Sequence, residues 1–168
     1  MKSKYVQYYV EGEDEKHLID VLKSKLKIIR PGKVQKLNVI EQEITNLHLR
    51  TFKPDTMVVL VFDTDTGNAQ TLRKNLQRLE KCPSVSEIIT IPQVSNLEDE
   101  LVRSCDIRTA PELLGSKSIR DFKRDFIRVS NLDQKLLEHN FDIHLLWTGT
   151  PLPPYQNIVN QSRSIKLI

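Results

Sequence analysis

The stretch that decides the fold is Met57-Val58-Val59-Leu60-Val61-Phe62-Asp63-Thr64-Asp65. Its first six residues are all apolar, and most of them are β-branched or aromatic. A continuous run of this kind is typical of a strand that is covered on both faces of a sheet. We therefore predict a buried strand over 55–62 that ends at Asp63 and Asp65.

Working outward from this strand, turn signals separate further segments with strand and helix patterns. Leu18, Leu22 and Leu26 recur at helical spacing after an acidic start that suits the positive end of a helix. The alternation of strands and helices predicts an α/β fold of the Rossmann-like kind, with a mainly parallel sheet of about four strands and helices on both faces. The expected strands are 6–10, 34–39, 55–62 and 85–91, and the expected helices are 13–26, 40–49, 68–81 and 97–103.

The last third of the chain departs from this alternation. Residues 119–128 and 132–139 have helical patterns, residues 142–147 have a strand pattern, and three prolines from Pro151 onward favour an extended tail. We divide the chain into a core over 1–105 and a C-terminal helical and strand appendage over 106–168, packed on the same domain.

Composition excludes several classes of protein. The 168 residues are 39% hydrophobic and 28% charged, which is typical of one globular domain. No apolar run approaches the ~20 residues of a membrane span, so we expect no membrane partner. Cys82 and Cys105 lack metal-ligand spacing and predict free thiols in a cytoplasmic protein. The net charge of +3 does not by itself indicate a nucleic-acid partner.

Acidic residues follow three of the predicted strands, where open α/β sheets bind their ligands. Glu11 follows the first strand, Asp63 and Asp65 follow the third, and Glu98 comes after the fourth. Carboxylates without nearby His or Cys suit Mg²⁺ or Mn²⁺, and clustered like charges are costly unless a cation neutralises them. An aspartate pair alone is equally typical of a turn.

Two of these segments resemble motifs of the TOPRIM domain family. Val10-Glu11-Gly12 resembles its opening Val-Glu-Gly motif, Asp63-Thr64-Asp65 resembles its D-x-D motif, and the resemblance spans roughly 5–103. It implies a divalent-metal-dependent nuclease that hydrolyses phosphodiester bonds of DNA or RNA. By the same resemblance, Glu11 would act as general acid/base or metal ligand, and the two aspartates would bind metal.

The chain is most similar to the OLD-type TOPRIM nucleases. In that subtype Glu15 and Glu98 would complete a site for two Mg²⁺ or Mn²⁺ ions, and a later lysine, either Lys117 or Lys123, would stabilise the scissile phosphate. The sequence contains no Walker A loop, zinc ribbon or topoisomerase tyrosine domain. We therefore expect a stand-alone TOPRIM nuclease, with a separately encoded ATPase or another protein as candidate partner.

Basic residues concentrate away from these acids, as expected for a polyanionic substrate. Solvated helix faces would give the same pattern. The candidate nucleic-acid-binding residues are Lys23, Lys25, Lys27, Arg30, Lys33, Lys36, Arg120 and Arg124.

Other interpretations of the same motifs remain open. A non-catalytic TOPRIM-like module that binds nucleic acid or regulates a partner would share the fold. A HAD-like phosphatase also places D-x-D after an apolar strand, but it requires Thr or Val where this chain has Gly67. A sugar-nucleotide transferase that uses D-x-D for metal ranks lower still.

Overall fold

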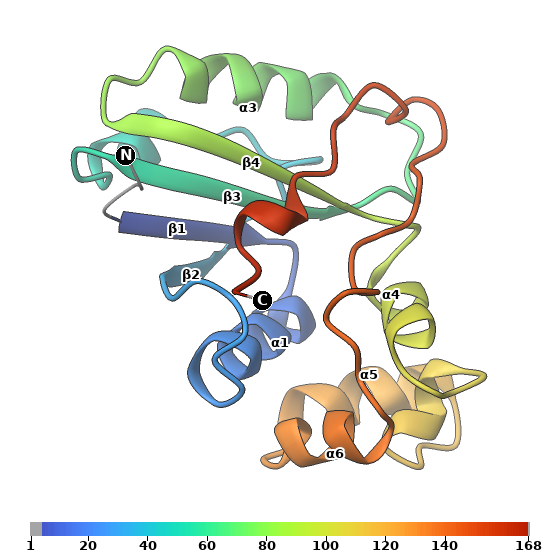
Figure 1. Cartoon of the computed structure of the whole chain (residues 1–168). Coiled ribbons are helices and arrows are strands. Elements are labelled where there is room, and N and C mark those ends of the chain that lie inside the picture. Colours follow the sequence, from blue (N-terminus) through green and yellow to red (C-terminus); the bar gives the residue numbers. More distant parts are fainter. Residues whose placement is uncertain (1–4, 168) are drawn as a thin grey trace.

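The computed structural model describes residues 5–167 and contains a four-stranded sheet in the order β2-β1-β3-β4 (Figure 1). All three strand pairings are parallel, which confirms the predicted α/β fold class. The strands are β1 (Tyr5–Val10), β2 (Lys33–Lys36), β3 (Thr56–Asp63) and β4 (Val85–Gln93).

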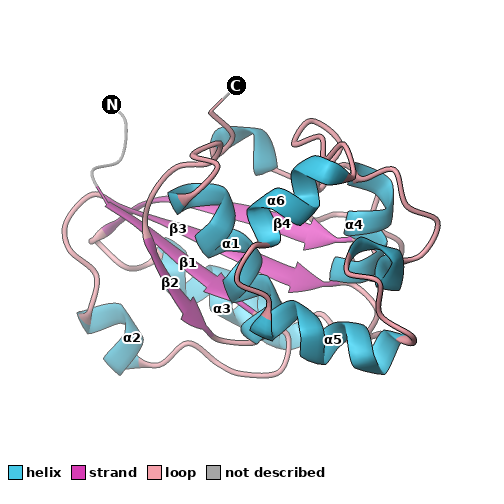
Figure 2. Ribbon diagram, turned by 90° about the horizontal axis from the view of Figure 1, so that it is seen from below, coloured by secondary structure: helices cyan, strands magenta, loops and turns pink. Residues whose placement is uncertain are grey.

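Helices cover both faces of this sheet. Helices α1, α4, α5 and α6 lie on one face and α3 lies on the other (Figure 2). The α-helices are α1 (Glu13–Ser24), α2 (Asn46–Arg50), α3 (Gln70–Glu80), α4 (Leu97–Ser104), α5 (Ile119–Arg128) and α6 (Leu132–Glu138), with 3-10 helices η1 (Ala110–Leu113) and η2 (Ser162–Ser164).

Strand β3 lies at the centre of the hydrophobic core, as its unbroken apolar sequence predicts. Side chains of a strand alternate between the two faces of the sheet. Val59 and Val61 therefore pack in the cluster that includes α1, α4, α5 and α6, whereas Leu60 and Phe62 pack in the cluster that includes α3. Both clusters exclude solvent from β3, so its C-terminal end is held rigidly.

Several predicted elements differ from the structure. Residues 142–147 do not form a strand: residues 143–147 are turns, and Trp147 has a positive φ of 58°. The helix predicted over 40–49 is reduced to α2, which begins at Asn46. Strand β4 continues through Pro92 to Gln93, because an edge strand tolerates a residue that cannot donate a backbone hydrogen bond.

The C-terminal segment returns to the sheet and covers the outer edge of β4. The backbone N–H of Thr90 donates to Gln161 Oε1 at 3.0 Å, and the backbone N–H of Gln161 donates to the Thr90 carbonyl at 2.9 Å. This segment, red in Figure 1, then crosses the sheet toward α1, where Lys166 forms a bridge with Ile29. Among residues 5–167, no helix is long and apolar enough to cross a membrane.

Candidate active site

The carboxyl ends of β1 and β3 bring Glu11 and Asp63 into contact. The two strands are adjacent and parallel, so their carboxyl ends lie side by side at the same end of the sheet. The backbone N–H of Asp63 donates to Glu11 Oε2 at 3.1 Å, and Asn38 Nδ2 donates to Glu11 Oε1 at 3.2 Å. Two donors from different elements therefore fix the position of the Glu11 carboxylate.

Gln93 fixes the carboxylate of Asp63 from the neighbouring strand. Asp63 is paired with Gln93 in the β3–β4 register, and Gln93 Nε2 donates to Asp63 Oδ1 at 2.7 Å. Trp147 Nε1 donates to Gln93 Oε1 at 3.2 Å. Because an indole nitrogen can only donate, it sets the orientation of the Gln93 amide and directs its NH₂ group to Asp63.

The contact between Gln93 and Asp63 is not predictable from the sequence. Gln93 is a polar residue next to a proline, and nothing local distinguishes it from other residues at strand ends. Its side chain is fully buried, and its partner Trp147 lies 54 residues further along the chain. Only the tertiary structure shows that a buried amide links the C-terminal extension to Asp63.

The predicted metal ligands share one electrostatic environment centred on Asp63. Burial, followed by the charge of Glu11, raises the pKa of Asp63 to about 8, and Asp65 and Glu98 add to the shift. Burial also raises the pKa of Glu11, partly offset by the hydrogen bond from the Asp63 backbone. We refer to Glu11, Glu15, Asp63, Asp65 and Glu98 as the acidic cluster.

Glu15 and Asp65 occupy opposite extremes of exposure within the acidic cluster. Glu15 is buried at the start of α1, where its Oε2 accepts a hydrogen bond from the Gly12 backbone N–H at 3.1 Å. Burial, with contributions from Asp14 and Asp63, raises the pKa of Glu15 to about 10. Asp65 is exposed in the loop after β3. Glu15 therefore has a helix-capping role besides any role as a ligand.

Glu98 lies at the start of α4 and faces Lys123 of α5. Its Oε1 atom is buried and forms an ion pair with Lys123 Nζ at 3.4 Å. Glu98 is the main cause of a raised pKa at Lys123, and Asp14 and Asp63 contribute to the same shift. The ammonium group of Lys123 therefore lies beside the acidic cluster.

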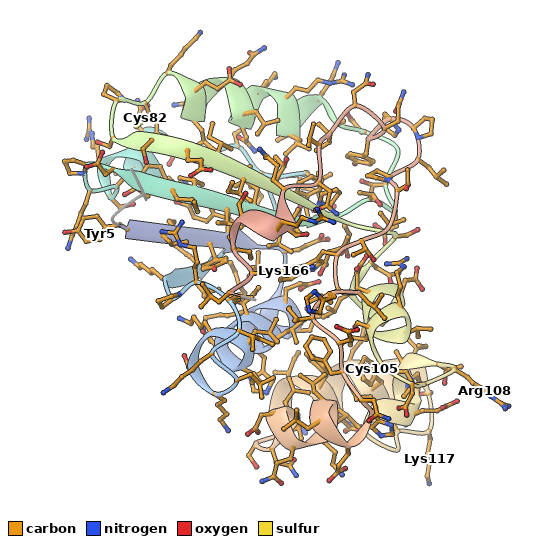
Figure 3. The ribbon with its side chains drawn as sticks, in the orientation of Figure 1. Tyr5, Cys82, Cys105, Arg108, Lys117 and Lys166 are labelled. Carbon is orange, nitrogen blue, oxygen red and sulfur yellow. The ribbon has the colours of Figure 1, made fainter. Side chains whose placement is uncertain are left out.

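Lys117 lies elsewhere. It is exposed in the loop before α5, and its side chain points away from the molecule at the end remote from the sheet (Figure 3). Of the two lysine candidates, the structure brings only Lys123 to the acids.

The candidate nucleic-acid-binding residues divide between the two ends of the sheet. Lys36 pairs with Val10 in the β1–β2 register and contacts Glu13 at 2.6 Å, beside the acidic cluster. Helix α1 runs away from the carboxyl ends of the strands for about 18 Å, given 1.5 Å per residue. Residues beyond the middle of α1 therefore lie toward the amino ends of the strands. These residues are Lys23, Lys25, Lys27 and Arg30. Lys33 begins β2, and Arg120 and Arg124 are exposed on α5.

Glu100, the neighbouring acid on α4, has a structural role. It is fully buried, and its Oε2 accepts from the Trp147 backbone N–H at 2.6 Å. Its Oε1 accepts from the Val94 backbone N–H at 3.1 Å and from Arg103 Nη1 at 2.5 Å. Glu100 therefore anchors the turn that carries Trp147 and is not part of the acidic cluster.

The chemistry of the acidic cluster fits a hard divalent cation. Its donors are carboxylate oxygens, and its members repel one another. Within residues 5–167, however, no three Asp, Glu, His or Cys side chains are close enough to form a metal-binding group as they are placed. Side-chain rotation would be needed to gather them around an ion.

No protein-family model, curated protein or solved structure matches this chain. The interpretation of the site therefore depends on the two motifs, on the parallel sheet that brings them together, and on the contacts described above.

Proposed function

We propose that this chain is a divalent-metal-dependent nuclease of the TOPRIM type that hydrolyses phosphodiester bonds of DNA or RNA. One observation carries the proposal. The carboxylate of Asp63 lies at the carboxyl edge of a parallel sheet, in electrostatic contact with Glu11, Asp65 and Glu98. A cation-binding role accounts for this concentration of charge, which is otherwise unfavourable to the fold.

The acidic cluster would hold one or two Mg²⁺ or Mn²⁺ ions, with Glu11, Asp63 and Glu98 as the principal ligands. When bound, such ions activate water and stabilise negative charge on a phosphodiester. Gln93 occupies Asp63 Oδ1, and Asp63 Oδ2 accepts no hydrogen bond in the described part of the chain, so Oδ2 is the oxygen available to a ligand.

Three residues of the site would bind the phosphate or assist its hydrolysis. Lys123 lies beside Glu98 with an exposed side chain, so its ammonium group can turn from the acids to a substrate oxygen. Glu11 has a raised pKa caused by burial, which suits a carboxylate that accepts a proton from water. Lys36 at the same edge would bind a neighbouring phosphate of the strand.

A cleavage panel tests the proposal. The purified chain is incubated with single- and double-stranded DNA and RNA, with Mg²⁺, Mn²⁺ or EDTA, beside the variants Asp63→Asn and Glu80→Gln. Glu80 is an exposed acid at the end of α3 and serves as the matched control. Running the panel on the chain alone also tests whether cleavage requires an ATPase or another protein partner.

We expect metal-dependent cleavage by the wild-type chain and by Glu80→Gln, and loss of that cleavage in Asp63→Asn. Cleavage that persists in Asp63→Asn would refute the proposed site. Nucleic-acid binding without cleavage or metal uptake would instead support a non-catalytic binding module.

A further inference from the structure

A second site candidate lies in the C-terminal extension. A cavity of about 500 Å³ opens between the turn at 143–148 and the segment around η2. This volume falls within the range of small-molecule sites, roughly 300–1,000 Å³. The residues that line it are His144, Trp147, Thr148, Asn160, Ser162, Arg163 and Lys166.

The charged side chains of this cavity are all basic. They are Arg163 and Lys166; His144 also lines the cavity, and none of the lining residues is acidic. Arg163 and the His144 ring have no hydrogen-bond or ion-pair partner within residues 5–167. Lys166 Nζ donates one hydrogen bond, to the Leu146 carbonyl at 2.6 Å, and has two further N–H groups. The cavity therefore presents unneutralised positive charge.

The nearest acids compensate this charge only in part. Glu100 is occupied by Arg103 and by two backbone N–H groups, and Asp142 Oδ1 accepts from the His144 backbone at 2.8 Å. Burial lowers the pKa of Lys166, Glu100 partly offsets this shift, and Arg163 lowers the pKa further against a smaller opposing effect of Asp142. An anion in the cavity would relieve this unfavourable environment.

The walls of the cavity are already fixed by their own hydrogen bonds. Asn160 Nδ2 and Ser162 Oγ both donate to the Trp147 carbonyl, and Thr148 Oγ1 donates to the Leu145 carbonyl at 2.7 Å. These neutral groups hold the cavity open, and the basic side chains remain available to a ligand. A preformed site loses little conformational entropy when its ligand binds.

We propose that this cavity is a phosphate-binding subsite. A guanidinium fork beside an ammonium group matches the several acceptor oxygens of a phosphate group better than a single carboxylate would. The phosphate could come from a nucleic-acid end or from a free phosphate ion, which offer the same oxygens.

The cavity is close to the acidic cluster. Trp147 lines the cavity, and its Nε1 atom reaches Gln93, which in turn contacts Asp63. One amide side chain thus separates the wall of the cavity from the proposed centre of cleavage. Use of the cavity for a nucleic-acid phosphate rests on the proposed nuclease function, whereas phosphate binding itself does not.

Trp147 provides a direct reporter, because it is the only tryptophan of the chain and lines the cavity. Its fluorescence is titrated in EDTA with inorganic phosphate, with a 5′-phosphorylated oligonucleotide and with the same oligonucleotide lacking that phosphate. EDTA prevents metal-dependent cleavage, so failure of the nuclease proposal does not affect the result.

We expect a saturable fluorescence change with at least one phosphate-bearing probe, and affinity at least tenfold lower in Arg163→Gln and in Lys166→Gln. Saturation by inorganic phosphate identifies the free ion as sufficient, whereas a response to the phosphorylated oligonucleotide alone identifies a strand end. Lys81→Gln, an exposed lysine at the end of α3, is the control and should bind like the wild type.

The subsite is refuted if no phosphate-bearing probe gives a saturable change. It is also refuted if Arg163→Gln, which alters an exposed side chain and should fold normally, binds as tightly as Lys81→Gln. Circular dichroism of each variant separates loss of binding from loss of fold.

Discussion

Replacement of Asp63 by asparagine should stabilise the metal-free protein at alkaline pH, although most substitutions at buried sites destabilise. The change removes one charge from the acidic cluster and keeps the shape of the side chain. An asparagine Oδ1 can still accept the hydrogen bond from Gln93. Its NH₂ group would replace Oδ2 and could donate to the neighbouring carboxylates.

The pH dependence follows from the raised pKa of Asp63. Burial and the neighbouring acids raise this pKa from 3.8 to about 8. The folded protein therefore retains the proton up to about pH 8, whereas the unfolded chain releases it near pH 4. Because the unfolded state binds fewer protons in this window, wild-type stability falls as the pH rises through it.

The size of the effect can be bounded. One unit of pKa corresponds to about 1.4 kcal/mol. The full difference between the folded and unfolded pKa of Asp63 would therefore lower the free energy of unfolding by roughly 6 kcal/mol above pH 8. Asp63 is only half-buried, so solvent screening and side-chain rotation reduce this value. We expect Asp63→Asn to raise the free energy of unfolding by about 1–3 kcal/mol at pH 9 and by less at pH 5.

Urea unfolding in EDTA at both pH values measures this difference, with Glu80→Gln as the control for loss of an exposed acid. The reasoning would be refuted if Asp63→Asn were destabilised to the same extent at pH 5 and pH 9. That result would show that the ionised carboxylate is well accommodated and that no cation is needed to neutralise it.

Three further substitutions test other parts of the structure. Lys123→Gln should reduce metal-dependent cleavage about 10²–10³-fold, as expected for loss of a group that stabilises transition-state charge. Substitution of exposed Lys117 by Gln is the control and should leave the cleavage rate unchanged. Equal effects of the two substitutions in a nicking assay would contradict the placement of Lys123. Glu100→Gln should lower the free energy of unfolding by about 1–3 kcal/mol, because it removes the charge of a buried carboxylate that pairs with partly exposed Arg103. An unchanged free energy of urea unfolding would show that the anchor is dispensable. Leu60→Ala should cost about 2–5 kcal/mol by leaving a cavity beside β3, and calorimetry showing an unchanged melting temperature would exclude the described packing.

The parts of the fold that depend on local sequence could be predicted, and the parts that depend on distant partners could not. Strand β3 was predictable because its own residues are apolar without interruption. The segment at 143–147 is also mostly apolar, but it forms turns, and buried Glu100, 47 residues away, accepts a hydrogen bond from the Trp147 backbone. A strand pattern does not reveal such a partner.

The same distinction applies to the candidate site. Glu11 and Asp63 follow adjacent parallel strands, so the pattern of strands and helices was enough to predict that they meet. The choice between Lys117 and Lys123 depends on how α5 packs near α4, which the sequence does not encode locally. Gln93 was missed because its role depends on Trp147 as much as on Asp63.

Equilibrium binding of Mn²⁺ tests the central claim most directly, because it requires neither a substrate nor a partner. Free Mn²⁺ is followed by electron paramagnetic resonance as the metal is titrated into wild-type chain, Asp63→Asn and Glu80→Gln. We predict saturable uptake of one or two ions by the wild type and by Glu80→Gln, and a loss of affinity of at least tenfold in Asp63→Asn. Absence of uptake by the wild type, or equal uptake by all three proteins, would contradict the assignment of the acidic cluster as a metal site.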